Sequence, residues 1–120
     1  MDFAALGIAV TSKRDAGTLV QYSFGLPEGR EDEVLFSLLN NMLNGYELSV
    51  SDPTNGDCDL EAKRSGSGYE IKRGCHGAYG TWRKATLEDA HAWLLPGALA
   101  ARRLARPGFG AMLVVPKRGK

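Results

Sequence analysis

Apolar side chains alternate with polar or small ones along several stretches of the chain, a pattern typical of strands that bury one face. In the stretch 18–24, for example, Val20, Tyr22 and Phe24 share one face. The polar residues 13–17 before it predict a hairpin loop. The strands that we predict are 6–11, 18–24, 46–51, 58–64, 69–75 and 109–115, with 78–83 either a further strand or a bulged continuation of 69–75.

A first helix is predicted where apolar residues recur at spacings of three and four. It starts between Pro27 and Glu31, where acidic residues crowd the first turns and complement the helix dipole. Asn44-Gly45 provides a stop signal at its C-terminal end. The stripe predicted to face the core consists of Val34, Leu35, Leu38, Leu39, Met42 and Leu43.

A second helix is predicted from Thr86, because Thr86 to Asp89 resembles a capping box. This helix reaches Leu95, and the next residue is Pro96, which cannot donate the hydrogen bond that a continuing helix needs. Either the helix kinks there, or a further helix begins with Pro96 and runs to about Arg106.

The stretch 58–75 predicts a β-hairpin with a definite register. A two-residue turn at Gly66-Ser67 suits glycine, which adopts a positive φ at low cost. Residues whose numbers add to 133 then face each other, and a slip by one residue would destroy two opposite-charge pairs. The facing pairs are Glu61–Lys72, Lys63–Glu70, Ala62–Ile71, Arg64–Tyr69 and Leu60–Arg73.

The same register places Cys58 opposite Cys75 at a non-hydrogen-bonded pair, where Cα atoms lie about 4.5 Å apart. This spacing falls within the range of about 4.4–6.8 Å that a disulfide tolerates. The alternative is two reduced, buried thiols packed side by side. We favour the reduced thiols because nothing marks the chain as secreted.

Taken together, these elements predict a single α+β domain over residues 1–120. We expect an antiparallel sheet of five or six strands in the order ββαβββααβ, with helices packed against it. No run of about 18 apolar residues is present to cross a membrane, and the N-terminus lacks the basic region of a signal peptide. We therefore expect a cytoplasmic protein.

The net charge of +1 conceals a marked asymmetry along the chain. Residues 1–60 hold three basic and ten acidic side chains, whereas residues 61–120 hold twelve basic and four acidic ones. Such a division produces a bipolar surface that steers charged partners, or else the two halves neutralise each other across the folded domain.

Candidate chemistry in the sequence is sparse. Cys75 and His76 are adjacent, and neighbouring side chains of a strand point to opposite faces, so they do not form a dyad. His91 could reach Cys75, but no signature of a catalytic cysteine accompanies it. The cysteines and histidines lack the spacing of a zinc site, and the glycines of 74–80 lack a phosphate-binding motif. We predict no enzyme activity, no metal and no cofactor.

Two charged groups are candidate binding sites. The acidic group suits docking onto a basic protein, such as a nuclease whose active site binds nucleic acid. The basic group near the C-terminus suits phosphates, with Tyr69, Tyr79 and Trp82 available to stack on bases. The acidic residues are Glu28, Glu31, Asp32, Glu33, Asp57 and Asp59, and the alternative nucleic-acid-binding residues are Arg102, Arg103 and Arg106.

In size, sparse chemistry, polarised charge and a glycine-punctuated meander, the chain resembles the small bacterial immunity proteins of contact-dependent growth inhibition and related polymorphic toxin systems. This resemblance implies a cytoplasmic, non-enzymatic inhibitor that binds one cognate toxin, commonly a nuclease, and masks its active site. The alternative function is a small nucleic-acid-binding module that uses the basic C-terminal segment.

Overall fold

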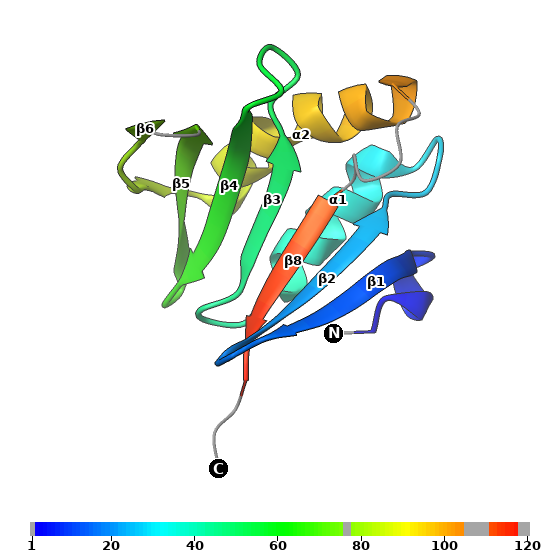
Figure 1. The fold of residues 1–120 in the computed structure, drawn as a ribbon, viewed down its shortest axis with the longest axis horizontal. Coiled ribbons are helices and arrows are strands. Elements are labelled where there is room, and N and C mark those ends of the chain that lie inside the picture. Colours follow the sequence, from blue (N-terminus) through cyan, green and yellow to red (C-terminus); the bar gives the residue numbers. More distant parts are fainter. Residues whose placement is uncertain (1, 76–77, 105–110, 118–120) are drawn as a thin grey trace.

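The computed structural model describes residues 2–75, 78–104 and 111–117, and it contains one antiparallel sheet with both α-helices on the same face (Figure 1). The α+β class is confirmed, but the described residues form eight strands rather than five or six. The sheet order is β1-β2-β8-β3-β4-β5-β6, and β7 also pairs with β5. The elements are η1 (Ala4–Leu6), β1 (Ala9–Ala16), β2 (Leu19–Gly25), α1 (Glu31–Asn41), β3 (Glu47–Ser51), β4 (Cys58–Ser65), β5 (Gly68–Cys75), β6 (Ala78–Tyr79), β7 (Arg83–Ala85), α2 (Leu87–Leu104) and β8 (Ala111–Pro116).

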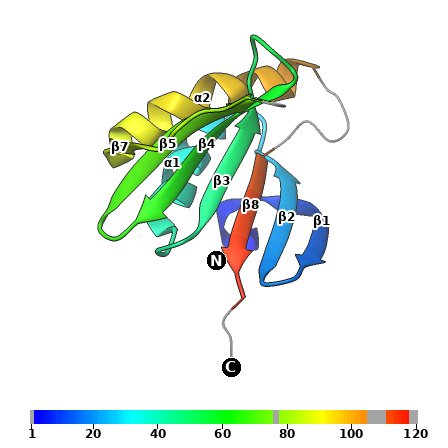
Figure 2. The same ribbon diagram turned by 60° about the vertical axis from the view of Figure 1, so that its left-hand side comes forward.

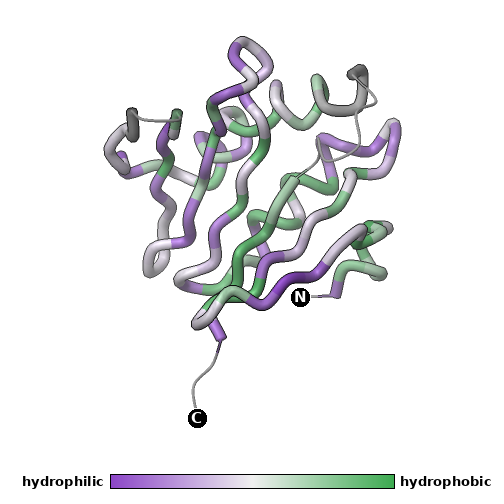
Figure 3. Tube along the Cα trace, in the orientation of Figure 1, coloured by the Kyte–Doolittle hydropathy of each residue, from purple (hydrophilic) through white to green (hydrophobic). Residues whose placement is uncertain are grey.

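The first hairpin differs from its prediction. Residues 13–16, expected in a loop, belong to β1, and Ala16 pairs with Leu19 across a two-residue turn in which Gly17 has a φ of 68°. Leu6, the first residue of the predicted strand, ends η1 instead, and β1 begins at Ala9. Alternation did not reveal residues 12–16 of β1, because β1 is an edge strand, nearly all of whose residues are exposed. Figure 3 shows a strongly hydrophilic stretch along it, as expected for a protected sheet edge.

The two extra strands come from the predicted stretch 78–83. β6 pairs with the end of β5, at Gly74 and Cys75, and β7 pairs with its beginning, at Tyr69 to Ile71. Each is only two or three residues long, too short for a periodic pattern to reveal. Together they cover the outer edge of β5.

The helix α2 continues through Pro96 instead of giving way to a second helix. Proline removes the hydrogen bond to the carbonyl of the residue four positions earlier, Ala92. Both Ala92 and Pro96 are exposed, so water can satisfy that carbonyl. The predicted end near Arg106 lies outside the described residues, and α2 is described as far as Leu104.

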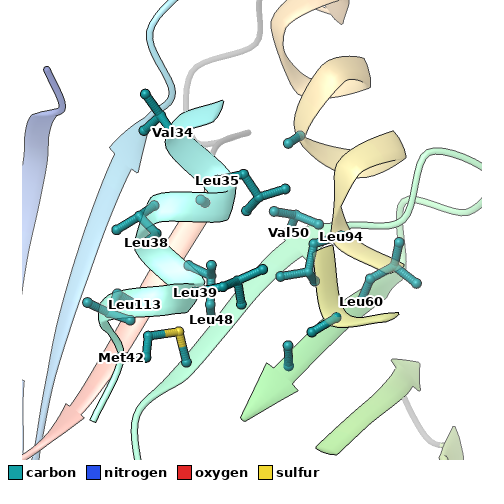
Figure 4. Close-up of a cluster of buried hydrophobic side chains, with 14 of the residues drawn as sticks. Val34, Leu35, Leu38, Leu39, Met42, Leu48, Val50, Leu60, Leu94 and Leu113 are labelled. Carbon is teal, nitrogen blue, oxygen red and sulfur yellow. The ribbon is translucent and has the colours of Figure 1, made fainter. Parts of the chain in front are cut away.

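The core lies between the two helices and one face of the sheet (Figures 2 and 4). The predicted stripe of α1 is buried except Leu43, which follows the helix and is 49% exposed. Leu94 of α2 joins this core. In the described part of the chain no helix is long and apolar enough to cross a membrane. The buried strand residues alternate with polar ones and include Leu48, Val50, Leu60, Ala62, Ile71 and Leu113.

The last strand, β8, occupies the centre of the sheet. Leu113 pairs with Tyr22 of β2 on one side and with Leu48 of β3 on the other, and its side chain is fully buried. β8 therefore joins the N-terminal hairpin to the meander β3-β4-β5. Those two parts are not neighbours in the sheet without it.

The register predicted for the β4–β5 hairpin is confirmed at every pair from Ser65–Gly68 to Cys58–Cys75. Gly66 has a φ of 61°, as its place in the turn requires. The preference for reduced cysteines is wrong, because Cys58 and Cys75 form a disulfide. The pairing itself explains the bond, since it brings the two residues to a Cα separation of 4.0 Å.

The disulfide should contribute measurably to stability. Closing a loop between residues 17 apart in sequence reduces the entropy of the unfolded chain and stabilises the fold by about 3 kcal/mol. We expect reduction under native conditions to lower the unfolding free energy by that amount in urea titrations. The Cys58→Ala/Cys75→Ala variant is the control, because reductant should not change its midpoint. An unchanged midpoint for the reduced wild-type chain would contradict the entropic account.

Gly97 allows α2 to approach β3 closely. A Cβ atom at this position would lie 2.5 Å from the carbonyl oxygen of Ser51 and 2.6 Å from Cγ2 of Val50. No L-residue larger than glycine fits without a shift of the helix or strand.

Gly97→Ala therefore tests this contact, because its effect on stability should have the opposite sign to the same change in an exposed helix. In an exposed helix the change stabilises by about 1 kcal/mol, but here we expect a loss of about 1–3 kcal/mol from overpacking. Gly56→Ala is the matched control, because nothing lies within 4 Å of its added Cβ and its φ is not positive. A gain in stability for Gly97→Ala, measured by urea unfolding, would show that α2 does not pack this closely.

Candidate protein-binding surface

The helices cover one face of the sheet, and the opposite face, here called the open face, carries no helix in the described structure (Figures 1 and 2). Strand pairing identifies its residues, because directly paired residues point to the same side. Its centre, on β8, presents the half-buried side chains of Met112 and Val114. The flanking β3, β4 and β5 present charged residues: Glu47, Asp59, Glu61, Lys63, Glu70 and Lys72.

Three acidic residues, here called the open-face carboxylates, gather on β3 and β4: Glu47, Asp59 and Glu61. Asp59 and Glu61 are two positions apart on one strand, and Glu47 lies diagonally opposite Glu61, since Ser49 is the direct partner of Glu61. Across the described residues none of the three forms an ion pair within 4 Å.

The open-face carboxylates are electrostatically unfavourable in the isolated chain. Partial burial raises the pKa of Glu61, the Lys72 ammonium opposes this effect, and the carboxylates of Glu47 and Asp59 add to it. Partial burial also raises the pKa of Asp59, although its side chain reaches solvent. Ionisation of Glu61 and of Asp59 is therefore less favourable in the folded chain than in water.

A tryptophan lies beside the open-face carboxylates, at the β5 edge of the open face. The ring of Trp82 has the ammonium of Lys63 4.4 Å from its centroid and that of Lys72 4.7 Å away. Lys63 also pairs with Glu70 at 3.4 Å. These contacts hold the segment before β7 across the sheet. They also engage the basic groups of this face, so its unpaired charge is acidic.

The acidic residues predicted as a partner-binding group do not form one patch. Glu31 is buried, only 4% exposed, so it does not belong to the surface. Asp32 lies 2.7 Å from His91, and Glu33 bonds Arg30 at 2.9 Å. Glu28 is exposed in the loop before α1, and Asp57 is exposed in the turn before β4. Asp59 alone points to the open face, because its neighbours Cys58 and Leu60 are buried on the helix side.

Folding brings some of the charges that are divided along the sequence into ion pairs. Three ion pairs join an acidic residue of the first half to a basic or titratable residue of the second: Asp52–Arg73 at 2.5 Å, Asp32–His91 at 2.7 Å and Asp15–Lys117 at 3.8 Å. Of the two readings of the asymmetry, mutual neutralisation accounts for these pairs. The open-face carboxylates are not part of it.

The structure offers little support for the predicted nucleic-acid site. Arg102 and Arg103 lie in the last turn of α2, but their side chains, like Arg106, lie outside the described residues. Tyr69, expected to stack on bases, is 6% exposed and its hydroxyl donates to the carbonyl of Leu39. The side chain of Tyr79 also lies outside the described part.

The catalytic-cysteine alternative is contradicted by the disulfide, because Cys75 has no free thiol. His91 contacts Asp32 and stacks edge-on against Phe36 instead of reaching Cys75, and His76 lies outside the described residues. Searching the described residues for three or more grouped histidine, cysteine or acidic side chains finds no arrangement suited to a metal ion. A shallow cavity of about 410 Å³ lies between β7 and α2, lined by Arg83, Asp89 and Trp93 among others.

Asp52, in the turn before β4, is a buried structural carboxylate. It accepts hydrogen bonds from the backbone and hydroxyl of Thr54, at 2.8 and 2.7 Å, and pairs with Arg73. Burial alone raises the pKa of Asp52, but the hydrogen bonds from Thr54 and Arg73 and the charge of Arg73 outweigh it. The pKa therefore lies below its ordinary value.

Acid should therefore remove the contribution of Asp52 to stability. Because its folded pKa is below the unfolded value of about 3.9, this contribution is complete above that value and is lost as the pH falls through the folded pKa. Asp52→Asn should cost about 1–3 kcal/mol near neutral pH, and the difference from wild type should shrink in acid. Asp57→Asn, in the same turn but exposed, is the control. A difference that is independent of pH in urea titrations would contradict this role.

Comparison of this chain with protein-family models, with curated protein sequences and with solved structures finds no match. The geometry described above is therefore the basis on which a function is assigned.

Proposed function

We propose that this chain is a non-enzymatic protein-binding domain whose open face binds a basic partner. One observation carries the proposal: Glu47, Asp59 and Glu61 share an uncovered sheet surface, while the other predicted acidic side chains are buried, paired or scattered. A bare polar face is common in antiparallel sheets. Here, however, the carboxylates of Glu47 and Asp59 add to the rise in the pKa of Glu61, which the Lys72 ammonium opposes without cancelling it.

Charge complementarity identifies the kind of partner. A lysine or arginine placed beside Glu61 would oppose the effects that raise its pKa, which are partial burial first and the carboxylates of Glu47 and Asp59 second. The half-buried Met112 and Val114, on the adjacent central strand, provide apolar contact beside the charges. Protein interfaces commonly combine an apolar centre with charges that set orientation and partner choice.

The partner class that we propose is a toxin, with a nuclease as the leading candidate. A nuclease active site must be basic to hold nucleic acid, and an acidic sheet face laid across it would exclude the substrate. This proposal matches the resemblance to bacterial immunity proteins and places the protein in the cytoplasm, where such a toxin acts. Nucleic acid is then the competitor of this chain rather than its ligand.

The binding face can be tested with two variants that change the net charge equally. Glu47→Gln/Glu61→Gln removes two open-face carboxylates, and Glu28→Gln/Glu33→Gln removes two acidic residues near α1. With the partner isolated by affinity capture in the presence of nuclease, calorimetry should show at least about a tenfold loss of affinity for the first variant. The second should change affinity by less than about threefold, as expected for a charge outside the interface.

The opposite ranking would place the interface at α1 and overturn the choice of the open face. Capture that yields only nucleic acid, lost on nuclease treatment, would favour the nucleic-acid alternative instead. Circular dichroism should show that both variants are folded. Neutral glutamine is used because lysine at position 61 would repel Lys72 across the strands.

A further inference from the structure

The two sulfurs of the disulfide lie in different surroundings. Cys58 is 1% exposed and enclosed, whereas Cys75 at the end of β5 is partly exposed. The two residues face each other at the end of one hairpin. A thiol arriving from solvent therefore meets the bond from one side.

The backbone around the two cysteines differs in the same way. Cys58 is held on both sides, because its N–H donates to the carbonyl of Asn55 and its carbonyl accepts from the N–H of Asp52. The outer neighbour of Cys75 is β6, which pairs with β5 at two positions only. Cys75 thus lies where the sheet is most easily opened, and Cys58 where it is fixed.

We propose that Cys58–Cys75 is a thiol–disulfide exchange site at which a dithiol reductant attacks Cys75 and Cys58 is the leaving and resolving thiol. Two effects compete in this assignment. Loss of a buried thiolate from Cys58 is less favourable than loss of an exposed one. Exchange nevertheless requires the attacking thiolate to reach a sulfur, and only Cys75 is reachable without displacing the core.

The exchange proceeds in two balanced steps. A thiolate of the reductant forms a bond to Sγ of Cys75 as the Cys58–Cys75 bond breaks, and Cys58 leaves as a thiolate that takes a proton from water. The second thiolate of the reductant then attacks its own sulfur in the mixed disulfide and releases Cys75. Two electrons pass to the cystine, which becomes two thiols, while the reductant becomes a disulfide.

Because Cys58 is enclosed next to Cys75, reductants with one thiol and with two thiols should act differently at this site. A monothiol bound to Cys75 faces the nearby Cys58, which attacks back and restores the disulfide, so a one-thiol reductant should give a transient mixed disulfide that must be trapped rather than complete reduction. A dithiol completes the reduction before Cys58 can return. The proposal is independent of the proposed function, because it concerns the reactivity of the chain alone.

Reduction of the disulfide should also affect the open face, because one segment of the chain connects the two. Two residues after β6 begins, the N–H of Gly80 donates to the carbonyl of Arg73, and Trp82 then lies over Lys63 and Lys72. The segment that positions Trp82 is thus anchored to the strand end that the disulfide fixes.

The test maps the point of attack on the intact oxidised chain. Excess glutathione is added under native conditions, free thiols are blocked within seconds by N-ethylmaleimide, and modified peptides are identified by mass spectrometry. We expect glutathione on Cys75 and maleimide on Cys58. Glutathione on Cys58, or equally on both, would overturn the proposal, as would reduction that is no faster than global unfolding followed by circular dichroism.

Two single variants provide an independent measurement. The free thiol of Cys75 in Cys58→Ala should react with a disulfide reagent at least about ten times faster than that of Cys58 in Cys75→Ala. Equal rates in two folded variants would contradict the assignment. If either variant unfolds, the same comparison is made by pulse alkylation of the reduced wild-type chain, in which Cys75 should again react first.

Discussion

The fold depends on one long-range constraint: β8 must enter between β2 and β3. The N-terminal hairpin and the meander β3-β4-β5 share no pairing with each other, so β8 alone makes them one sheet. Leu113 is buried at this junction beneath the helices. Because β8 pairs with β2 and β3, which lie far from it in the sequence, closing the sheet carries a loop-entropy cost that local hairpins avoid.

The packing of both helices on one face of the sheet determines which residues the opposite face can carry. Both helices pack on the same face, and their apolar stripes are satisfied there. The open face consequently needs no apolar cover for stability, which leaves it available for charged residues. Partial burial and the neighbouring carboxylates of Glu47 and Asp59 raise the pKa of Glu61, and in the function that we propose a basic partner would oppose this effect.

The candidate site illustrates the limits of sequence reasoning. Counting acidic residues gave the same sign of charge as the site that we propose and included Asp59, but it grouped residues by proximity in the chain. Glu31 is drawn into the interior at the first turn of α1, and Asp32 is paired with His91 from the other half of the chain. Glu47 and Glu61, which belong to the site that we propose, were not among the predicted binding residues, since each was assigned to a strand pattern. The signal that could have found them was their alternation with buried Leu48 and Ala62, which places both on the outer face.

The sequence by itself determined the local elements and the β4–β5 hairpin, including the facing positions of its two cysteines. A tight turn and two opposite-charge pairs are encoded within eighteen residues, and local contacts of this kind are readable because only one register satisfies them all. Tertiary structure alone decided the central place of β8, the continuation of α2 through Pro96, the short strands β6 and β7, and which charges neutralise one another. These features depend on contacts between residues far apart in the chain, which no local pattern of hydrophobicity records.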